Sequence, residues 1–159
     1  MTERAPFRGR AASRRDPQGH ACWGLKIFLY FIGKPRDEHA NAMAGEFIKR
    51  STRFATCEMR EIDPRRFDPF AKHPAAAKIL LDPAAKLCDS AAFARWFEEG
   101  RDLVFIVGGA DGFSDDWRGR ADRLVSFSPM TMPHELARVV LAEQIYRALT
   151  SLRGHPYPR

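Results

Sequence analysis

Short apolar runs alternate with amphipathic stretches along most of the chain, which predicts strands separated by helices. The run at 26–32 is rich in β-branched and aromatic residues and ends at Gly33, so it predicts a buried strand. The continuous apolar run at 103–107 predicts a strand that is buried on both faces. Weaker patterns predict further strands at 56–62, 79–81 and 124–127.

Two long helices are predicted from apolar residues at helical spacing. The first begins with Asp37 and Glu38 and ends with Lys49 and Arg50, an order of charges that favours the helix dipole. Its expected buried face consists of Ala40, Met43, Ala44, Phe47 and Ile48. The last helix is expected to open at Pro133 and to stop at Gly154. Its expected buried side consists of Leu136, Val140, Ile145, Leu149 and Leu152.

Shorter helices are predicted where a capping side chain precedes apolar residues. Asp89 and Ser90 precede an apolar face of Phe93, Trp96 and Phe97, and Gly100 ends that helix. Ser114 is expected to cap a short helix through Trp117, whereas residues 63–74 carry three prolines and are expected to be irregular. Strands that alternate with helices predict an α/β fold with a mostly parallel sheet in one domain, residues 26–159.

Composition narrows the class of protein. With 159 residues, 45% of them hydrophobic and 29% charged, the chain has the make-up of an ordinary globular domain. We expect a cytoplasmic protein without a membrane span, because no apolar run approaches the roughly 18 to 20 residues that a span needs. Cys22, Cys57 and Cys88 are too far apart for a disulfide framework or a paired-thiolate metal site, and no metal is expected.

The first 25 residues are expected to form a basic, disordered extension. They contain five arginines against Glu3 and Asp16, with no apolar periodicity, in a chain whose net charge is +6. Positive charge favours a polyanionic partner, but it does not distinguish RNA from DNA or from a solvated tail.

Two segments are candidates for ligand binding. A glycine-rich turn at 107–112 follows the central strand, where open α/β sheets bind ligands and where glycine lets a ligand approach the backbone. This turn matches neither the dinucleotide fingerprint nor the P-loop, so an ordinary tight turn remains open as an alternative. The mostly uncharged stretch at 127–133 either wraps an adenine-bearing ligand or is a plain connection.

In order and spacing, three segments resemble the RlmH family of ribosomal RNA methyltransferases. They are Phe-Ile-Val-Gly-Gly at 105–109, Ser-Phe-Ser-Pro-Met-Thr-Met-Pro-His at 126–134 and Arg-Val-Val-Leu-Ala-Glu-Gln-Ile-Tyr-Arg-Ala at 138–148. The resemblance implies a homodimeric enzyme of the SPOUT class, whose C-terminal segment threads a deep trefoil knot. It implies S-adenosylmethionine as cofactor and methylation of the ring N-3 of a pseudouridine in large-subunit (23S) ribosomal RNA.

Carried over position by position, the family's cofactor contacts fall on strand ends and loops of this chain. They are Leu81, Gly108, Phe127, Ser128, Pro129, Met130, Thr131 and Met132. Methyl transfer from a sulfonium requires a bent cofactor with its adenine in an apolar slot, which segments of this kind can provide.

The resemblance assigns the RNA end of the site to His134, Arg138, His155 and Tyr157. Arginine can pair with phosphate, and tyrosine can stack on a base. Because N-3 must lose a proton, His134 or His155 could act as the base. Structural roles remain open: His134 could fill the first helical turn, and Glu143 with Arg147 could be a solvated i,i+4 pair.

The chain departs from the family in three places. It ends in Tyr157, Pro158 and Arg159, so the histidine that usually follows the tyrosine is missing. Residues 60–77 are shorter and richer in proline than the family pattern, and residues 1–25 have no counterpart. Two rival hypotheses follow: a catalytically weak RNA- or ribosome-binding SPOUT protein, or a nucleotide-binding α/β domain that acts on a small molecule.

Overall fold

The computed structural model describes residues 14–15, 21–22 and 24–157. Most of the basic segment expected to be disordered therefore lies outside the described residues. Within that segment, β1 (Arg14–Arg15) pairs antiparallel with β2 (Ala21–Cys22).

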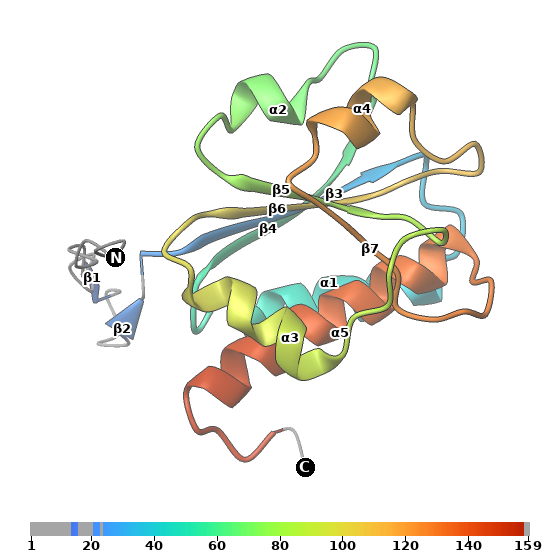
Figure 1. Cartoon of the computed structure of the whole chain (residues 1–159). Coiled ribbons are helices and arrows are strands. Elements are labelled where there is room, and N and C mark those ends of the chain that lie inside the picture. The colour runs from blue at the N-terminus through green and yellow to red at the C-terminus, as the bar shows by residue number, and fades with distance from the viewer. Residues whose placement is uncertain (1–13, 16–20, 23, 158–159) are drawn as a thin grey trace.

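Five parallel strands form the central sheet, in the order β4-β3-β6-β5-β7 (Figure 1). Their bounds are β3 (Lys26–Ile32), β4 (Thr56–Ile62), β5 (Ala77–Leu81), β6 (Leu103–Val107) and β7 (Arg123–Val125). Every residue of β6 is buried, as expected for a continuous apolar run in the centre of a parallel sheet. The predicted α/β class and the parallel sheet are confirmed.

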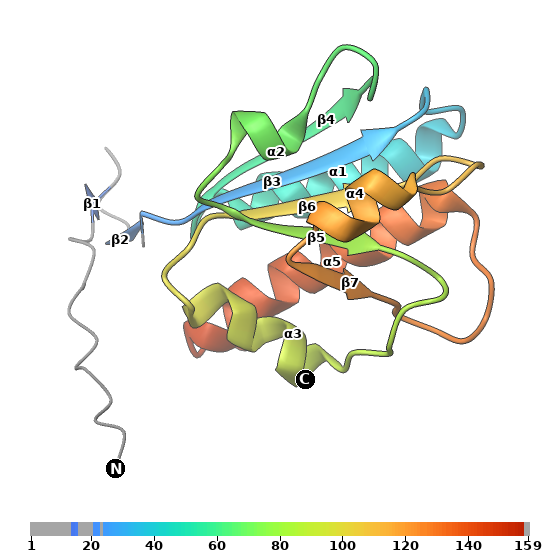
Figure 2. The same ribbon diagram turned by 45° about the horizontal axis from the view of Figure 1, so that its top comes forward.

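Helices cover both faces of this sheet, which makes three layers. Figures 1 and 2 show α1 (Glu38–Ser51), α3 (Ser90–Arg95) and α5 (His134–Leu152) on one face. The short helices α2 (Pro69–Lys72) and α4 (Asp115–Arg120) lie on the other face. A turn of 3-10 helix, η1 (Trp96–Glu98), extends α3.

The central strand contributes to two hydrophobic cores because its side chains alternate between the faces of the sheet. Phe105 points to the α1/α3/α5 side, where it stacks on Phe93 at 5.3 Å between ring centroids. Val104 and Ile106 belong to the core on the other side, which includes Trp117 of α4. Both layers are therefore held to the same buried strand.

Polar caps start the helices as their sequences predict. The side chain of Asp37 accepts from the backbone N of His39 and of Ala40, and Asp89 accepts from Ala92 at 2.7 Å. Ser114 caps α4 through Trp117. One cap was not predicted: Asp68 caps α2, so the segment expected to be irregular contains one helical turn.

Two residues assigned to buried helix faces are exposed. Met43 on α1 is 55% exposed and Leu136 on α5 is 49% exposed. The buried arc of α5 includes instead Leu141 and Ala142, because this helix packs against α1 and α3 as well as the sheet. Apolar spacing identifies the hydrophobic positions, but the neighbouring elements decide which of them are covered.

The described residues provide neither a membrane helix nor a metal cluster. None of their helices is long and apolar enough to cross a bilayer. They contain no group of three or more His, Cys, Asp or Glu arranged to hold a metal ion. Cys57 and Cys88 are free thiols, and burial raises the pKa of the Cys57 thiol to about 12.

Candidate functional site

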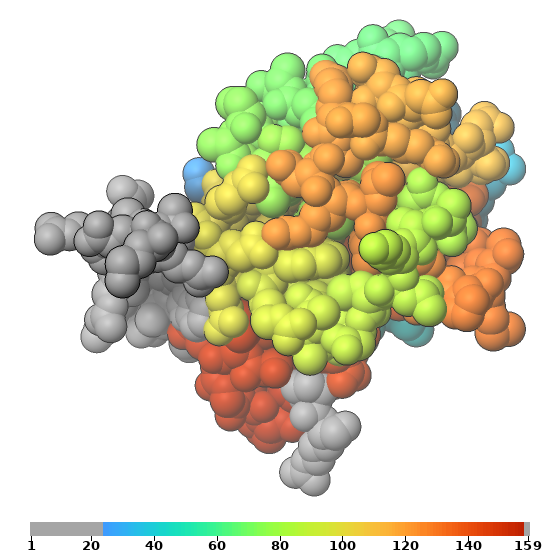
Figure 3. Space-filling model, in the orientation of Figure 1, coloured from blue at the N-terminus to red at the C-terminus, as the bar shows by residue number. Residues whose placement is uncertain are grey.

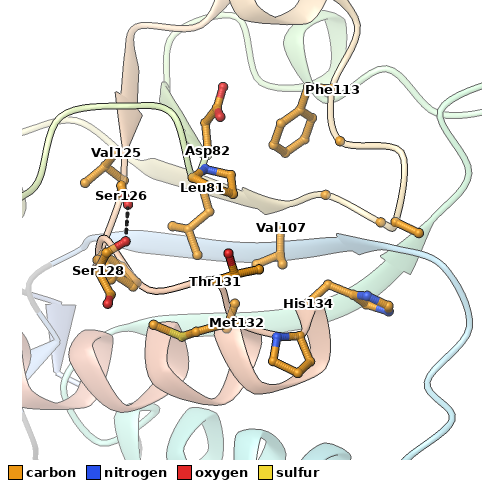
Figure 4. A pocket seen from close by; sticks show the side chains of 18 of the residues that line it. Leu81, Asp82, Val107, Phe113, Val125, Ser126, Ser128, Thr131, Met132 and His134 are labelled. Atoms are coloured by element: carbon orange, nitrogen blue, oxygen red, sulfur yellow. Dashed lines mark hydrogen bonds between the residues drawn. The ribbon is translucent and has the colours of Figure 1, made fainter.

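A cavity of about 330 Å³ opens at the carboxyl ends of β5, β6 and β7. Its wall is made by the segments that follow these strands and by the start of α5 (Figure 4). The lining residues include Leu81, Asp82, Val107, Gly108, Phe113, Arg118, Phe127, Ser128, Thr131, Met132 and His134. The volume lies within the range typical of sites for small organic ligands.

Strand register brings the three strand ends together. Leu81 is the partner of Val107 on β6 and also of Val125 on β7. Three segments that are distant in the sequence therefore leave the sheet side by side. This is the edge at which open parallel sheets bind ligands.

Hydrogen bonds hold the segment after β7 against the segment after β5. The backbone N of Ser126 donates to the carbonyl of Lys86 at 3.0 Å, and the backbone N of Cys88 donates to the carbonyl of Ser126 at 3.2 Å. The hydroxyl of Ser126 donates to the carbonyl of Ser128 at 3.0 Å (Figure 4). The backbone N of Met130 donates to the Ser128 hydroxyl at 2.9 Å, so this loop has a defined shape.

Gly108 is favoured by close packing rather than by its backbone angles. A Cβ atom at this position would lie 3.3 Å from the ring of Phe113, which forms part of the cavity wall. The turn that follows needs glycine for a different reason, because Gly112 has φ of +68°. Gly109 and Gly112 form an isolated antiparallel bridge that closes this turn.

An ion pair that the sequence analysis missed lies in the cavity wall. Nη1 of Arg118 lies 3.2 Å from Oδ2 of Asp82, whose side chain is only 4% exposed. The other carboxylate oxygen of Asp82 accepts from the backbone N of Ala84 at 3.0 Å. A signal was present in the sequence, since Asp82 directly follows a predicted strand, but nothing there connected it with an arginine on α4.

The residues predicted to contact the cofactor gather at this cavity. All of them except Pro129 line it, including Leu81, Gly108 and the residues of the loop after β7. Their agreement with the cavity is geometric, and their contact with a cofactor remains a prediction.

The two predicted residues at the start of α5 differ in their exposure. His134 is exposed and lies at the cavity. The side chain of Arg138 is only 1% exposed, with its guanidinium 3.9 Å from the centroid of the Phe31 ring. Among the described residues none accepts a hydrogen bond from its Nε, Nη1 or Nη2. Burial lowers the pKa of Arg138, while Glu135, 3.9 Å away, opposes this shift.

The two predicted tail residues do not line the cavity. Tyr157 packs on Tyr146 with ring centroids 4.8 Å apart, and His155 lies edge-on to Phe54. Glu143, which accepts from the Tyr157 hydroxyl, is about 15 Å along the helix axis from Pro133. Within one chain, the four residues assigned to the RNA end therefore form two separate groups.

Over residues 25–158 the chain matches the protein family described as "Predicted SPOUT methyltransferase". It is 61% identical over 139 residues to "Ribosomal RNA large subunit methyltransferase H" of Solibacter usitatus, an alignment that covers 85% of this chain and 100% of the relative. A protein of the same name from Thioalkalivibrio sulfidiphilus is 48% identical over 155 residues, which cover 85% of this chain and 99% of that protein.

Solved structures share the fold at low sequence identity. A probable methylase family protein from Haemophilus influenzae has a TM-score of 0.58 at 9% identity, covering 85% of this chain and 70% of the other. A putative methyltransferase from Bacillus anthracis, described as acting on RNA, has a TM-score of 0.56 at 11% identity. The match covers 84% of this chain and 97% of the other. A putative methyltransferase from Legionella pneumophila, solved with bound S-adenosylmethionine, has a TM-score of 0.50 at 16% identity. The match covers 80% of this chain and 66% of the other.

Proposed function

The chain belongs to the SPOUT methyltransferase family, together with the ribosomal RNA large subunit methyltransferases H, and we propose that it performs their reaction. The proposed substrate is large-subunit ribosomal RNA, methylated at the ring N-3 of a pseudouridine with S-adenosylmethionine as donor. The observation that carries the proposal is the cavity where the segments after β5, β6 and β7 meet.

The residues of the cavity fit S-adenosylmethionine. Most of the lining is apolar, which suits the adenine ring, and the loop at 127–132 adds backbone polar groups. The absence of a side chain at Gly108 lets the Phe113 ring pack against the strand end, and both residues line the cavity. Leu81, Gly108 and the loop would hold the cofactor, which supplies a methyl group made electrophilic by the sulfonium.

The protein must also help N-3 to lose its proton. The imidazole of His134 lies at the cavity, so it can accept a proton from N-3 of a pseudouridine that is presented there. The Arg138 guanidinium lies one helical turn further along and is buried, with donors that lack protein acceptors among the described residues. We assign these two residues to the substrate side of the reaction.

We further infer that the chain is knotted. Ser126 pairs with Lys86 and Cys88 on the segment after β5, and the chain, which comes from α4 on one face of the sheet, then continues into α5 on the other face. In the proposed knot, the residues after β7 pass through the loop formed by that earlier segment. Such threading would keep the cavity walls together without a disulfide.

We propose that the active form is a homodimer. Met43 and Leu136 are exposed on α1 and α5, two helices that pack side by side, and a second copy would cover them. The C-terminal tail of one copy would then reach the cavity of the other and add to the RNA-binding surface. The basic residues 1–25 would form an extension that contacts RNA, and a ribosomal substrate implies a cytoplasmic location.

The decisive test is to incubate the purified chain with methyl-labelled S-adenosylmethionine and ribosomes from a strain that lacks this modification. We expect label in large-subunit RNA, confined by nuclease mapping and mass spectrometry to one pseudouridine. The Gly108→Val variant provides the control for label that does not depend on the cavity.

Other outcomes would favour the rival hypotheses. Intact cofactor binding without label in ribosomes, subunits or free RNA would favour a catalytically weak RNA-binding protein. This alternative is favoured by the positions of His155 and Tyr157, which lie apart from the cavity within one chain. Absence of both cofactor binding and ribosome binding would favour a domain that acts on a small molecule.

A further inference from the structure

Charge in the cavity is concentrated at one place. Apart from His134, the ionisable residues of the lining are Asp82 and Arg118, which pair with each other at 3.2 Å. Figure 4 shows Asp82 and Phe113 on the opposite side of the cavity from Thr131 and Met132. The cavity thus has a charged end and a loop end.

The ion pair keeps unused hydrogen-bonding capacity. A guanidinium has five N–H donors, and no hydrogen bond joins Nε of Arg118 to an acceptor within the described part of the chain. A carboxylate offers about four lone-pair sites, and within that part the Asp82 carboxylate contacts only the Arg118 guanidinium and the backbone N of Ala84. Asp82 is 4% exposed and Arg118 39% exposed, so the arginine is the more accessible partner.

S-adenosylmethionine carries complementary charges at the end remote from its adenine. Its amino-acid end has an ammonium and a carboxylate on the same carbon atom, so a closely spaced acid and base can meet both groups. Hydrogen bonds between charged partners are shorter and stronger than neutral ones, particularly in a partly buried site.

We propose that Asp82 and Arg118 form the subsite for the zwitterionic amino-acid end of S-adenosylmethionine. Asp82 accepts from the ammonium, and Arg118 donates to the carboxylate. The inference rests on the proposed use of this cofactor. It adds two positioning residues to the predicted contacts, and it orients the cofactor with the adenine at the loop of residues 127–132.

Three ligands separate this role from a structural one. S-adenosylmethionine has both the amino-acid end and the sulfonium charge, S-adenosylhomocysteine has only the amino-acid end, and methylthioadenosine has neither. Their affinities are measured by calorimetry on the purified full chain and on the variants Asp82→Asn and Arg118→Met. The matched control is Arg120→Met, since Arg120 also lies on α4 but pairs with Asp68 outside the cavity.

We expect both cavity variants to lose about ten- to hundredfold in affinity for S-adenosylmethionine and S-adenosylhomocysteine. Methylthioadenosine should bind within about twofold of its wild-type affinity, which also demonstrates a folded cavity. The Arg120→Met variant should bind all three ligands as the wild type does.

Four results would overturn the inference. Equal losses for all three ligands would mean that the pair only supports the cavity wall, and unchanged affinities would remove it from the site. A loss confined to S-adenosylmethionine would mean that Asp82 senses the sulfonium instead. A wild-type chain that binds none of the ligands would instead refute the proposed cofactor, and the inference would fall with it.

Discussion

The hydroxyl of Tyr157 donates a 2.7 Å hydrogen bond to Oε1 of Glu143, which ties the C-terminal tail to the middle of α5. Glu143 also pairs with Arg147 at 2.7 Å, and the Arg147 guanidinium lies over the Tyr157 ring. Burial, followed by Glu143, raises the pKa of the Tyr157 phenol. The i,i+4 pair is thus partly buried and joined by the tail, and is not simply a solvated pair.

In the proposed homodimer, a tail held away from its own cavity is expected to act in the cavity of the second copy. Gly108→Val should inactivate the cavity and Tyr157→Ala should inactivate the tail, so each homodimer should lack methyl transfer. Equal amounts of the two variants, mixed after reversible dissociation, should recover about a quarter of wild-type activity. Half of the dimers are then mixed, and each mixed dimer holds one complete site out of two. Label incorporation into large-subunit RNA measures the recovery.

Each variant mixed with itself is the control for this experiment. Recovery that never rises above these controls, although mass spectrometry detects the mixed dimer, would mean that the tail does not act across the interface.

Gly108 should tolerate no branched side chain. The Gly108→Val side chain would press on Phe113, whose ring lies 3.3 Å from the position of a Cβ, and would narrow the cavity. We expect at least about a hundredfold loss of affinity for S-adenosylmethionine, by calorimetry, and a loss of about 1–3 kcal/mol in the free energy of unfolding. Gly119→Ala is the control, because a Cβ there meets no atom within 4 Å. Wild-type affinity in Gly108→Val would exclude this strand end from the cofactor site.

Arg138 should matter more for activity than for stability. The buried Arg138 guanidinium makes no hydrogen bond among the described residues, and Met can keep the apolar contact with Phe31, so Arg138→Met should have a free energy of unfolding within about 1 kcal/mol of wild type, or higher. Methyl transfer should fall at least about a hundredfold if the guanidinium serves the substrate. Denaturant titration and label incorporation provide the two measurements.

A surface arginine separates this effect from a general loss of charge. Arg50→Met removes the exposed i,i+4 pair with Glu46 and should measurably change neither the free energy of unfolding nor the rate of methyl transfer. An Arg138→Met chain that is fully active, or one that is inactive because it unfolds, would contradict the assigned role.

His73 should make the fold less stable in mild acid. Burial, and then Lys72, lowers the pKa of the His73 imidazole, whose Nε2 lies 2.7 Å from the Tyr30 hydroxyl. The fold therefore favours the neutral ring. As the pH falls through the unfolded-state pKa of about 6.5, the unfolded chain takes up a proton that the folded chain resists, so stability declines.

The variant His73→Gln keeps a hydrogen-bonding side chain but does not titrate in this range. Its free energy of unfolding should decline less than that of the wild type between about pH 7 and pH 5. Urea titrations at several pH values measure the difference. Parallel curves for the two proteins would show that His73 does not contribute.

Local patterns determined most of the secondary structure. The strands β3 and β6 have the bounds that their apolar runs predict, because a continuous apolar run between polar segments has few other ways to be buried. Asp37, Asp89 and Ser114 cap their helices because each bond is made within a few residues of the same segment. The resemblance then identified the loop and the glycine that line the cavity.

Tertiary structure alone decided how these segments meet. Sequence order does not reveal that β6 lies between β3 and β5, and it is this pairing that brings Leu81 beside Val107. The contact of Asp82 with Arg118 joins residues from different elements, for which no local period exists. The exposure of Leu136 and the burial of Arg138 likewise depend on which neighbours pack against α5. Periodicity records how one segment is patterned, whereas the site arises from pairing between segments that lie far apart in the chain.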